Sequence, residues 1–293
     1  AQLGARVVAV DMPGFGLTGR PGALPDYDAV RMLQELVPAL GLPGPLLLLG
    51  HSLGGLVAAK YSLAQRAAVS AAKAEPAAAA APAGLVLLAP LLIPQPPGAA
   101  AARAGGAAAA LRDAAALAAA LASATLRYAL SLVVLLVSPL LAQLLRTFVY
   151  SRAFWVNGIG SAYHDPAKLS PETLDGYRRA ARVRGWDRGF VAFARFRATG
   201  GMSLWQLLAK GWRSARDPEG LPEALAEGGA PTLLLHGEGD RIIPASNSRA
   251  LAAALPHAAL EAVPACGHCP QEEAPDAVVA AIVRFARQHG LAR

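Results

Sequence analysis

Cysteine is scarce in this sequence, with Cys266 and Cys269 the only two among 293 residues. Two thiols cannot build a disulfide framework, so the fold does not depend on an oxidising compartment. The count favours an intracellular or organellar protein over a secreted one, but the compartment itself is unknown from the sequence. Six scattered histidines and two cysteines offer no metal-ligand spacing, and we therefore predict no metal site.

Acidic residues are outnumbered by basic ones, 20 against 27, which gives a formal net charge of +7. Much of the excess is arginine gathered between Arg178 and Arg197. Trp186, Phe190 and Phe193 fall at helical spacing inside that stretch, so an amphipathic helix with a solvated basic face is the simplest interpretation. The functional alternative is that these arginines attract anionic lipid or phosphate. No recognition module accompanies the arginines, and we predict no nucleic-acid partner.

Charge is missing altogether from the 18 residues between Tyr128 and Leu145. This length reaches the lower limit for a membrane-spanning helix, but Pro139 and Gln143 weaken that interpretation. We expect an apolar helix that faces the substrate or the core. An interfacial helix in peripheral contact with a membrane, or a true span, remains an alternative.

Short apolar runs bounded by glycine and proline indicate parallel strands that are buried on both faces. They are Arg6–Val10, Leu46–Leu49, Leu85–Leu88, Thr232–Leu235 and Leu260–Val263. Helical patterns follow some of them, at Leu53–Arg66, Ala245–Ala254 and Ala277–Arg287. This alternation predicts an α/β fold with a mostly parallel wound sheet.

The middle of the chain loses the strand–helix rhythm. Residues 91–229 carry helical patterns with all four tryptophans, and we expect a helical cap inserted between two parts of an α/β core, 1–90 and 230–293. Alanine-rich, low-complexity stretches at 67–83 and 98–124 are expected to be surface insertions or loose helices.

Gly50-His51-Ser52-Leu53-Gly54 matches the pattern G-x-S-x-G, and it lies where that pattern requires, between a strand and a helix. The glycines permit a sharp turn that presents the Ser52 hydroxyl above the sheet. An ordinary glycine-rich turn is the alternative explanation. A serine hydroxyl is a poor nucleophile without a base, so a histidine and an acid should follow.

An acid and a histidine do follow, each just past a predicted strand. Asp240 ends the run that begins at Thr232, and His268 comes shortly after Val263. Taken singly, Asp240 fits a turn residue and His268 an ordinary loop histidine. The order Ser, Asp, His, with every member at the carboxyl end of a parallel strand, favours a catalytic triad.

With these motifs and the segments Val8–Gly16 and His236–Pro244, the chain resembles the α/β-hydrolase superfamily, in its cap-bearing branch of esterase-like and lipase-like enzymes. The resemblance implies a triad of Ser52, Asp240 and His268, with the backbone N–H of Leu53 as one oxyanion donor. It also implies that the first strands and the loop that supplies a second donor are missing. We therefore expect a truncated chain with an incomplete oxyanion hole.

Two further motifs suggest other chemistry and fail on context. Gly14-Phe15-Gly16-Leu17-Thr18-Gly19 fits G-x-G-x-x-G, but Arg20-Pro21-Gly22 interrupts the helix that a dinucleotide site needs. We interpret it as a rim loop, with Asp11 structural. Cys266-Gly267-His268-Cys269 matches C-x-x-C outside a thioredoxin-like setting, and we expect two buried thiols beside His268.

The sequence predicts a serine hydrolase that cleaves a small, apolar ester through an acyl-enzyme on Ser52 and needs no cofactor. The same three residues could instead transfer the acyl group to another acceptor or hydrolyse a carbon–carbon bond. A non-catalytic scaffold that binds a ligand or partner is the alternative from a different class.

Overall fold

The computed structural model describes residues 4–42, 45–72, 81–92, 107–209 and 221–291. One four-stranded sheet lies at its centre, with all neighbouring strands parallel. In spatial order the strands are β1 (Leu47–His51), β2 (Gly84–Leu88), β3 (Thr232–Gly237) and β4 (Ala258–Val263). The predicted α/β class is confirmed, because four predicted apolar runs form these strands.

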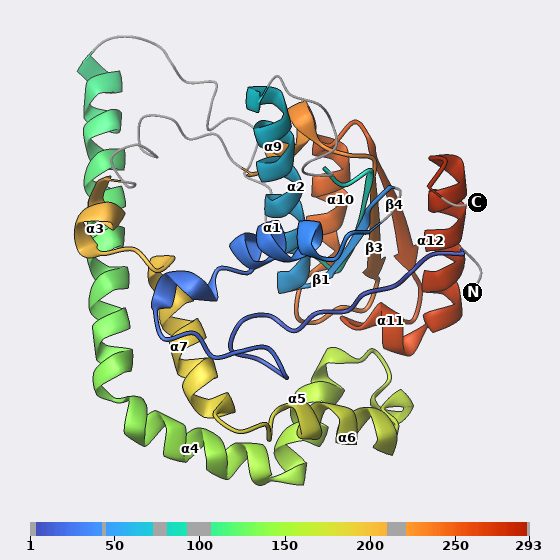
Figure 1. Cartoon of the computed structure of the whole chain (residues 1–293), viewed down its shortest axis with the longest axis horizontal. Coiled ribbons are helices and arrows are strands. Elements are labelled where there is room, and N and C mark those ends of the chain that lie inside the picture. The colour runs from blue at the N-terminus through green and yellow to red at the C-terminus, as the bar shows by residue number, and fades with distance from the viewer. Residues whose placement is uncertain (1–3, 43–44, 73–80, 93–106, 210–220, 292–293) are drawn as a thin grey trace.

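Helices cover both faces of this sheet (Figure 1). On one face, Leu85, Leu87 and Leu234 pack with residues of α2 (Leu53–Ala72), α9 (Leu221–Gly228) and α10 (Ala245–Ala254). On the other face, Val86, Leu88, Leu233 and Leu235 pack with residues of α12 (Pro275–Gln288). A one-turn helix, α11 (Pro270–Glu273), precedes α12. Successive side chains of β2 and β3 thus enter opposite layers, which explains their continuous apolar sequences.

The predicted strand at Arg6–Val10 does not form. Residues 4–10 carry no strand pairing, and Val7 is 88% exposed. Within the described chain β1 pairs with β2 alone, and this segment does not pair with the free outer edge of β1. The chain continues through a short 3-10 helix, Leu24–Tyr27, into α1 (Ala29–Ala39), whose N-cap is Asp28.

Between β2 and β3 the structure is helical over residues 107–209 apart from connecting turns. We call the five long helices here the cap helices: α3 (Ala107–Leu136), α4 (Ser138–Tyr150), α5 (Arg152–Ala162), α6 (Pro171–Ala180) and α7 (Trp186–Thr199). A 3-10 turn, Pro166–Lys168, separates α5 from α6. That 91–229 form one inserted unit stays a prediction.

The cap helices are joined by polar contacts that involve α7. Arg195 Nε donates to the Ser131 carbonyl oxygen of α3 at 3.2 Å, and Arg146 of α4 forms an ion pair with Asp187. Figure 1 shows α3 and α4 as the outer border of the molecule, with α7 inside them. The predicted helix around Trp186, Phe190 and Phe193 is therefore α7, which contacts both α3 and α4 from the inner side of the cap.

The uncharged stretch from Tyr128 to Leu145 is not one helix, and it does not face the core. It breaks between Leu136 and Ser138, where Pro139 in the first turn of α4 lacks a backbone N–H donor. Helix α3 is long and apolar enough to cross a membrane over Ala114–Leu136, yet only 11% of its most apolar window is buried. The expectation of an inward-facing helix is therefore wrong.

The alanine-rich stretches are partly helical. Residues 67–72 continue α2, and residues 107–124 belong to α3. Residues 81–83 precede β2 without helical structure, and residues 73–80 and 98–106 lie outside the described residues.

Candidate active site

Ser52 occupies a sharp turn between β1 and α2. Its φ is 51°, in the left-handed region that side chains rarely adopt. A Cβ at Gly50 would lie 2.3 Å from the Gly54 carbonyl oxygen, so the turn closes only with glycine at that position. The Ser52 N–H donates to the Leu88 carbonyl oxygen at 2.9 Å, which ties the turn to β2. Leu53 begins α2, where the first N–H groups have no partner inside the helix.

Asp240 follows β3 and is held on both carboxylate oxygens. Oδ1 accepts hydrogen bonds from the backbone N–H groups of Ile242 (2.7 Å) and Ile243 (2.9 Å). Oδ2 lies 2.7 Å from His268 Nδ1 and 3.1 Å from His236 Nε2. Burial by itself would raise the pKa of the Asp240 carboxyl group. These hydrogen bonds lower the pKa by a larger amount, so the net pKa is well below the usual range. Asp240 is therefore a fixed, ionised acceptor.

His268 lies in the loop after β4 and is buried. Its Nδ1 donates to Asp240, which in a neutral imidazole leaves Nε2 as the proton acceptor. The structure thus brings together two of the three residues predicted to form the triad. Among the described residues the Ser52 hydroxyl makes no hydrogen bond to His268, a common feature of sites without substrate.

His51 connects the serine turn to the histidine loop. Its Nε2 lies 2.7 Å from the His268 carbonyl oxygen, which can only accept, so Nε2 donates. The two rings lie 4.8 Å apart. Burial lowers the pKa of His51, against the opposing effect of this hydrogen bond, and favours the neutral ring. Sequence reasoning missed His51, although its place beside Ser52 was a usable signal.

His236, at the end of β3, is a second missed residue. Its Nε2 faces two acceptors, Asp240 Oδ2 and the Ile243 carbonyl oxygen at 2.9 Å, and must carry a proton. Its Nδ1 lies 2.6 Å from Ser248 Oγ. If that hydroxyl donates, the neutral ring satisfies all three contacts. His236 thereby holds the same Asp240 oxygen that His268 contacts.

The end of α5 is fastened to the His268 loop. The His268 N–H donates to the Ala162 carbonyl oxygen at 2.7 Å. The buried Glu273 accepts from the N–H of Gly267 at 2.7 Å and from the N–H of His164 at 2.8 Å. One carboxylate thus bridges the two segments. Pairing of this kind arises only in the folded structure, and no pattern in the sequence predicts it.

Glu272, which is less buried than Glu273, also connects the segment after His268 to the cap. Its two oxygens accept hydrogen bonds from the hydroxyls of Tyr163 (2.5 Å) and Tyr177 (2.7 Å). Burial and the bond to Glu272 raise the pKa of both tyrosines well above the usual value. These hydroxyls therefore stay protonated and keep α5 and α6 on the core.

The two cysteines beside His268 are free and buried, as expected from the sequence. Burial, followed by the negative charges of Glu273 and Glu272, raises the pKa of Cys266 and of Cys269 to about 12. Neither thiol is a nucleophile near neutral pH. The described residues contain no cluster of three or more histidine, cysteine or acidic side chains that could hold a metal ion.

The glycine-rich segment after Asp11 is a loop. Asp11 Oδ2 accepts from the Leu17 N–H at 2.9 Å, and the Asp11 carbonyl oxygen accepts from the Thr18 hydroxyl at 2.8 Å. Residues 12–19 form turns without a helix, which removes the context for dinucleotide binding and confirms the structural role of Asp11.

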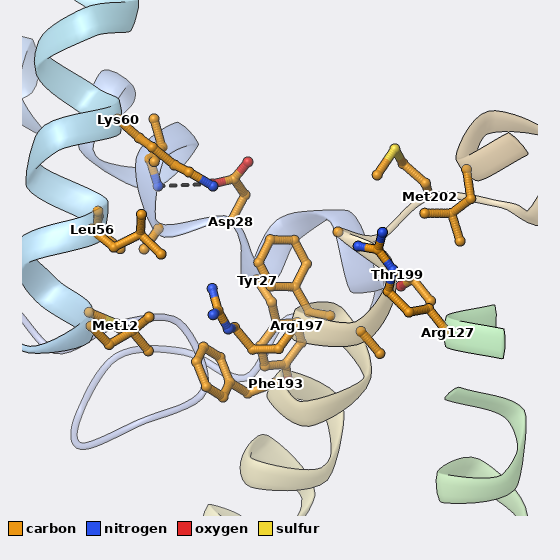
Figure 2. A pocket seen from close by; sticks show the side chains of 18 of the residues that line it. Met12, Tyr27, Asp28, Leu56, Lys60, Arg127, Phe193, Arg197, Thr199 and Met202 are labelled. Carbon is orange, nitrogen blue, oxygen red and sulfur yellow. Dashed lines mark hydrogen bonds between the residues drawn. The ribbon is translucent and has the colours of Figure 1, made fainter. Parts of the chain in front are cut away.

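A cavity of about 580 Å³ lies between the core and the cap helices, beside the serine turn. Leu53, adjacent to Ser52, forms part of its wall. Figure 2 shows Met12, Leu56 and Phe193 on its apolar side, with the Arg197 side chain extending among them from α7. Lys60 and Arg127 also line it. Asp28 lines it as well, so the cavity combines apolar walls with charged ones that are basic except for this carboxylate.

Comparison with known proteins places this geometry in context. A family model described as alpha/beta hydrolase fold matches residues 1–275. A serine hydrolase involved in carbazole degradation is similar at a TM-score of 0.60 and 17% identity, over 95% of this chain and 78% of the other. An esterase from Thermogutta terrifontis is similar at a TM-score of 0.55 and 22% identity, over 95% of this chain and 78% of the other. The 2-hydroxy-6-oxo-6-phenylhexa-2,4-dienoate hydrolase of Rhodococcus sp. strain RHA1 has a TM-score of 0.55 and 20% identity, over 94% of this chain and 78% of the other.

Proposed function

The chain belongs to the alpha/beta hydrolase family, and on that basis we propose that it is a serine hydrolase that cleaves an ester through an acyl-enzyme on Ser52. The observation that carries the proposal is the 2.7 Å contact between His268 Nδ1 and Asp240 Oδ2, at the carboxyl end of the sheet beside the strained turn of Ser52. Strained backbone of this kind persists where the surrounding fold imposes it, and functional sites are frequent examples.

In the proposed mechanism, His268 Nε2 takes the proton of the Ser52 hydroxyl while the oxygen attacks the ester carbonyl carbon. The developing oxyanion accepts a hydrogen bond from the Leu53 N–H at the start of α2. His268 then donates its proton to the leaving alcohol. Water, deprotonated by the same nitrogen, cleaves the acyl-enzyme. Asp240 keeps Nδ1 protonated throughout and stabilises the charged imidazole.

The cavity supports an ester with an apolar group. Met12, Leu56 and Phe193 can bury an acyl or alcohol chain next to Leu53. Arg127 and Arg197 make the same space electropositive, which favours esters that also carry a negative charge over esters that carry a positive one. A chain-length and charge panel of nitrophenyl esters reads out both features.

The test of the reaction class is labelling with a fluorophosphonate probe, which modifies activated serines. We expect the wild-type protein to be labelled at Ser52, located by peptide mass spectrometry, and Ser52→Ala to be unlabelled. A folded protein that resists the probe would favour the non-catalytic scaffold and contradict the proposal.

The alternatives with the same three residues are separated by their products. Adding a competing alcohol to the ester reaction diverts product to a new ester if the enzyme is an acyltransferase. Turnover of a vinylogous diketone without turnover of any ester would identify a carbon–carbon bond hydrolase. Ester hydrolysis to free acid, unaffected by added alcohol, is the outcome that we expect.

A further inference from the structure

Helices α3 and α4 present a continuous apolar surface on the outside of the cap. Figure 1 shows them as the border farthest from the sheet and meeting at a corner. Exposure is greatest there: Leu136 is 81% exposed and Leu140 is 73% exposed. Isolated exposed leucines are ordinary, but contiguous apolar patches on soluble proteins mark binding surfaces.

This surface follows from how α3 packs. One face of the helix, with Ala124 and Ser131 buried, lies toward α7, where Arg195 bonds to Ser131. The outward positions Leu126, Leu130 and Val133 of α3 follow the spacing i, i+4, i+7 and are exposed, and so is Val137, which follows the helix directly. A surface helix in water would carry polar residues on that face. The outer face of α3 is therefore suited to a non-aqueous partner.

Arginine predominates among the charged residues around this surface, although Arg146 is paired with Asp187 of α7. Residues 114–162 contain no aspartate or glutamate, and their only charged side chains are Arg127, Arg146 and Arg152. The end of α4 meets further arginines, because the Arg182 guanidinium lies 5.5 Å from the ring centre of the exposed Tyr150. Arg178, Arg179 and Arg182 line a groove of about 480 Å³ there, with Asp175 paired to Arg178. An apolar surface edged with arginine complements an anionic lipid bilayer.

We propose that the α3–α4 surface docks the protein on anionic membranes, with the corner at Leu136 and Leu140 among the acyl chains and the arginines beside the headgroups. The inner face of α3 lines the substrate cavity through Ala120, Ser123 and Ala124. One helix therefore separates the proposed membrane surface from the cavity, which places a lipid-dissolved substrate close to the site. Docking itself does not depend on the proposed reaction.

The test is co-sedimentation of the full chain with phosphatidylcholine vesicles that contain or lack phosphatidylserine. We expect the wild type to pellet with the phosphatidylserine vesicles, and high salt to weaken binding because it screens the headgroups. The double variant Leu136→Glu/Leu140→Glu should bind at least about tenfold more weakly. Arg179→Gln should lose about fivefold, the usual effect of one basic residue near an anionic surface.

Matched controls make the same changes on other helices. Val279→Glu alters an exposed apolar position of α12, and Arg249→Gln alters an exposed arginine of α10; both should bind like the wild type. Circular dichroism and hydrolysis of a soluble ester, measured separately, report whether each variant is folded and active.

Three outcomes would overturn the proposal. The first is wild-type binding no stronger to phosphatidylserine vesicles than to phosphatidylcholine alone. The second is a wild-type dimer in light scattering that Leu136→Glu/Leu140→Glu converts to a monomer, because the surface then joins two copies. The third is resistance of the vesicle-bound protein to alkaline carbonate extraction, which would identify α3 as a membrane-spanning helix.

Discussion

At the scale of single residues, the predicted triad members act in one proton-transfer path. In the proposed mechanism Asp240 orients His268 and His268 activates Ser52, so removing any one of them should stop the same step. We expect Ser52→Ala and His268→Ala each to lower kcat on the order of 10⁶-fold, and Asp240→Asn on the order of 10⁴-fold. Ester turnover under saturating substrate is the measurement.

The double variants provide the critical comparison. Ser52→Ala/His268→Ala should be little slower than either single variant, because the second residue has no remaining function. Losses that add in log kcat would show that the two side chains act independently. Thermal melting of each variant verifies that a folded protein is being compared.

Sequence reasoning found the residues that carry motifs and missed those that act through tertiary contacts. Ser52, Asp240 and His268 were accessible because each follows a recognisable strand. Glu273 has no such signal: its partners are Gly267, six positions before it, and His164, 109 positions before it. His51 lies within a recognised motif, but its partner, the His268 carbonyl oxygen, is 217 positions away.

At the scale of elements, the contact between α5 and the His268 loop sets the position of the predicted general base. A Cβ on Gly267 would lie 2.4 Å from the Ala162 carbonyl oxygen and 2.5 Å from the His164 nitrogen. Both neighbours are backbone atoms, so they cannot swing aside. We expect Gly267→Ala to displace His268, to lower kcat more than it changes KM, and to destabilise the fold by about 1–3 kcal/mol in urea unfolding.

The matched control is Gly158→Ala in α5 itself. A Cβ there meets nothing within 4 Å, and alanine is the better helix former. This variant should keep wild-type turnover with unchanged or slightly higher stability. Equal losses in the two variants would mean that the close approach at Gly267 is not what positions His268.

Elements were predictable where packing and periodicity agree. The strand runs Leu46–Leu49, Leu85–Leu88 and Thr232–Leu235 are correct within about two residues. For the last two, burial on both faces requires the continuous apolar sequence. Arg6–Val10 has the same apolar appearance but forms no strand. The stretch Tyr128–Leu145 is apolar on all sides, so its periodicity could not tell which face would pack.

At the scale of the whole molecule, the outer edge of β1 is a candidate site for aggregation. In the described chain this edge has no strand partner, and Leu49 is 49% exposed beside it. Exposed sheet edges pair with other chains, and a lysine on the edge strand opposes such pairing. We expect Leu49→Lys to slow aggregation, followed by light scattering on warming, with little change in the melting temperature.

The control for net charge is Val279→Lys on α12, which adds the same charge away from the edge. If Val279→Lys slows aggregation as strongly as Leu49→Lys does, general repulsion accounts for the effect and the edge of β1 is not the route.

Acid should destabilise the folded molecule in two stages. Burial lowers the pKa of His51 below its unfolded value of about 6.5, so the unfolded chain binds more protons as the pH falls through that value. This stability is complete above about pH 6.5 and is lost progressively below it. Burial by itself would raise the pKa of Asp240, but hydrogen bonds lower it by a larger amount. The contribution of Asp240 to the free energy of unfolding is therefore lost only below its unfolded pKa of about 3.9.

His51→Gln isolates the first stage. Glutamine can still donate to the His268 carbonyl oxygen but does not titrate, so the free energy of unfolding should fall less steeply between about pH 7 and pH 5 than in the wild type. Part of the slope should persist, because burial also lowers the pKa of His257. Urea unfolding across this range is the measurement, and identical slopes for the two proteins would show that protonation of His51 is not coupled to folding.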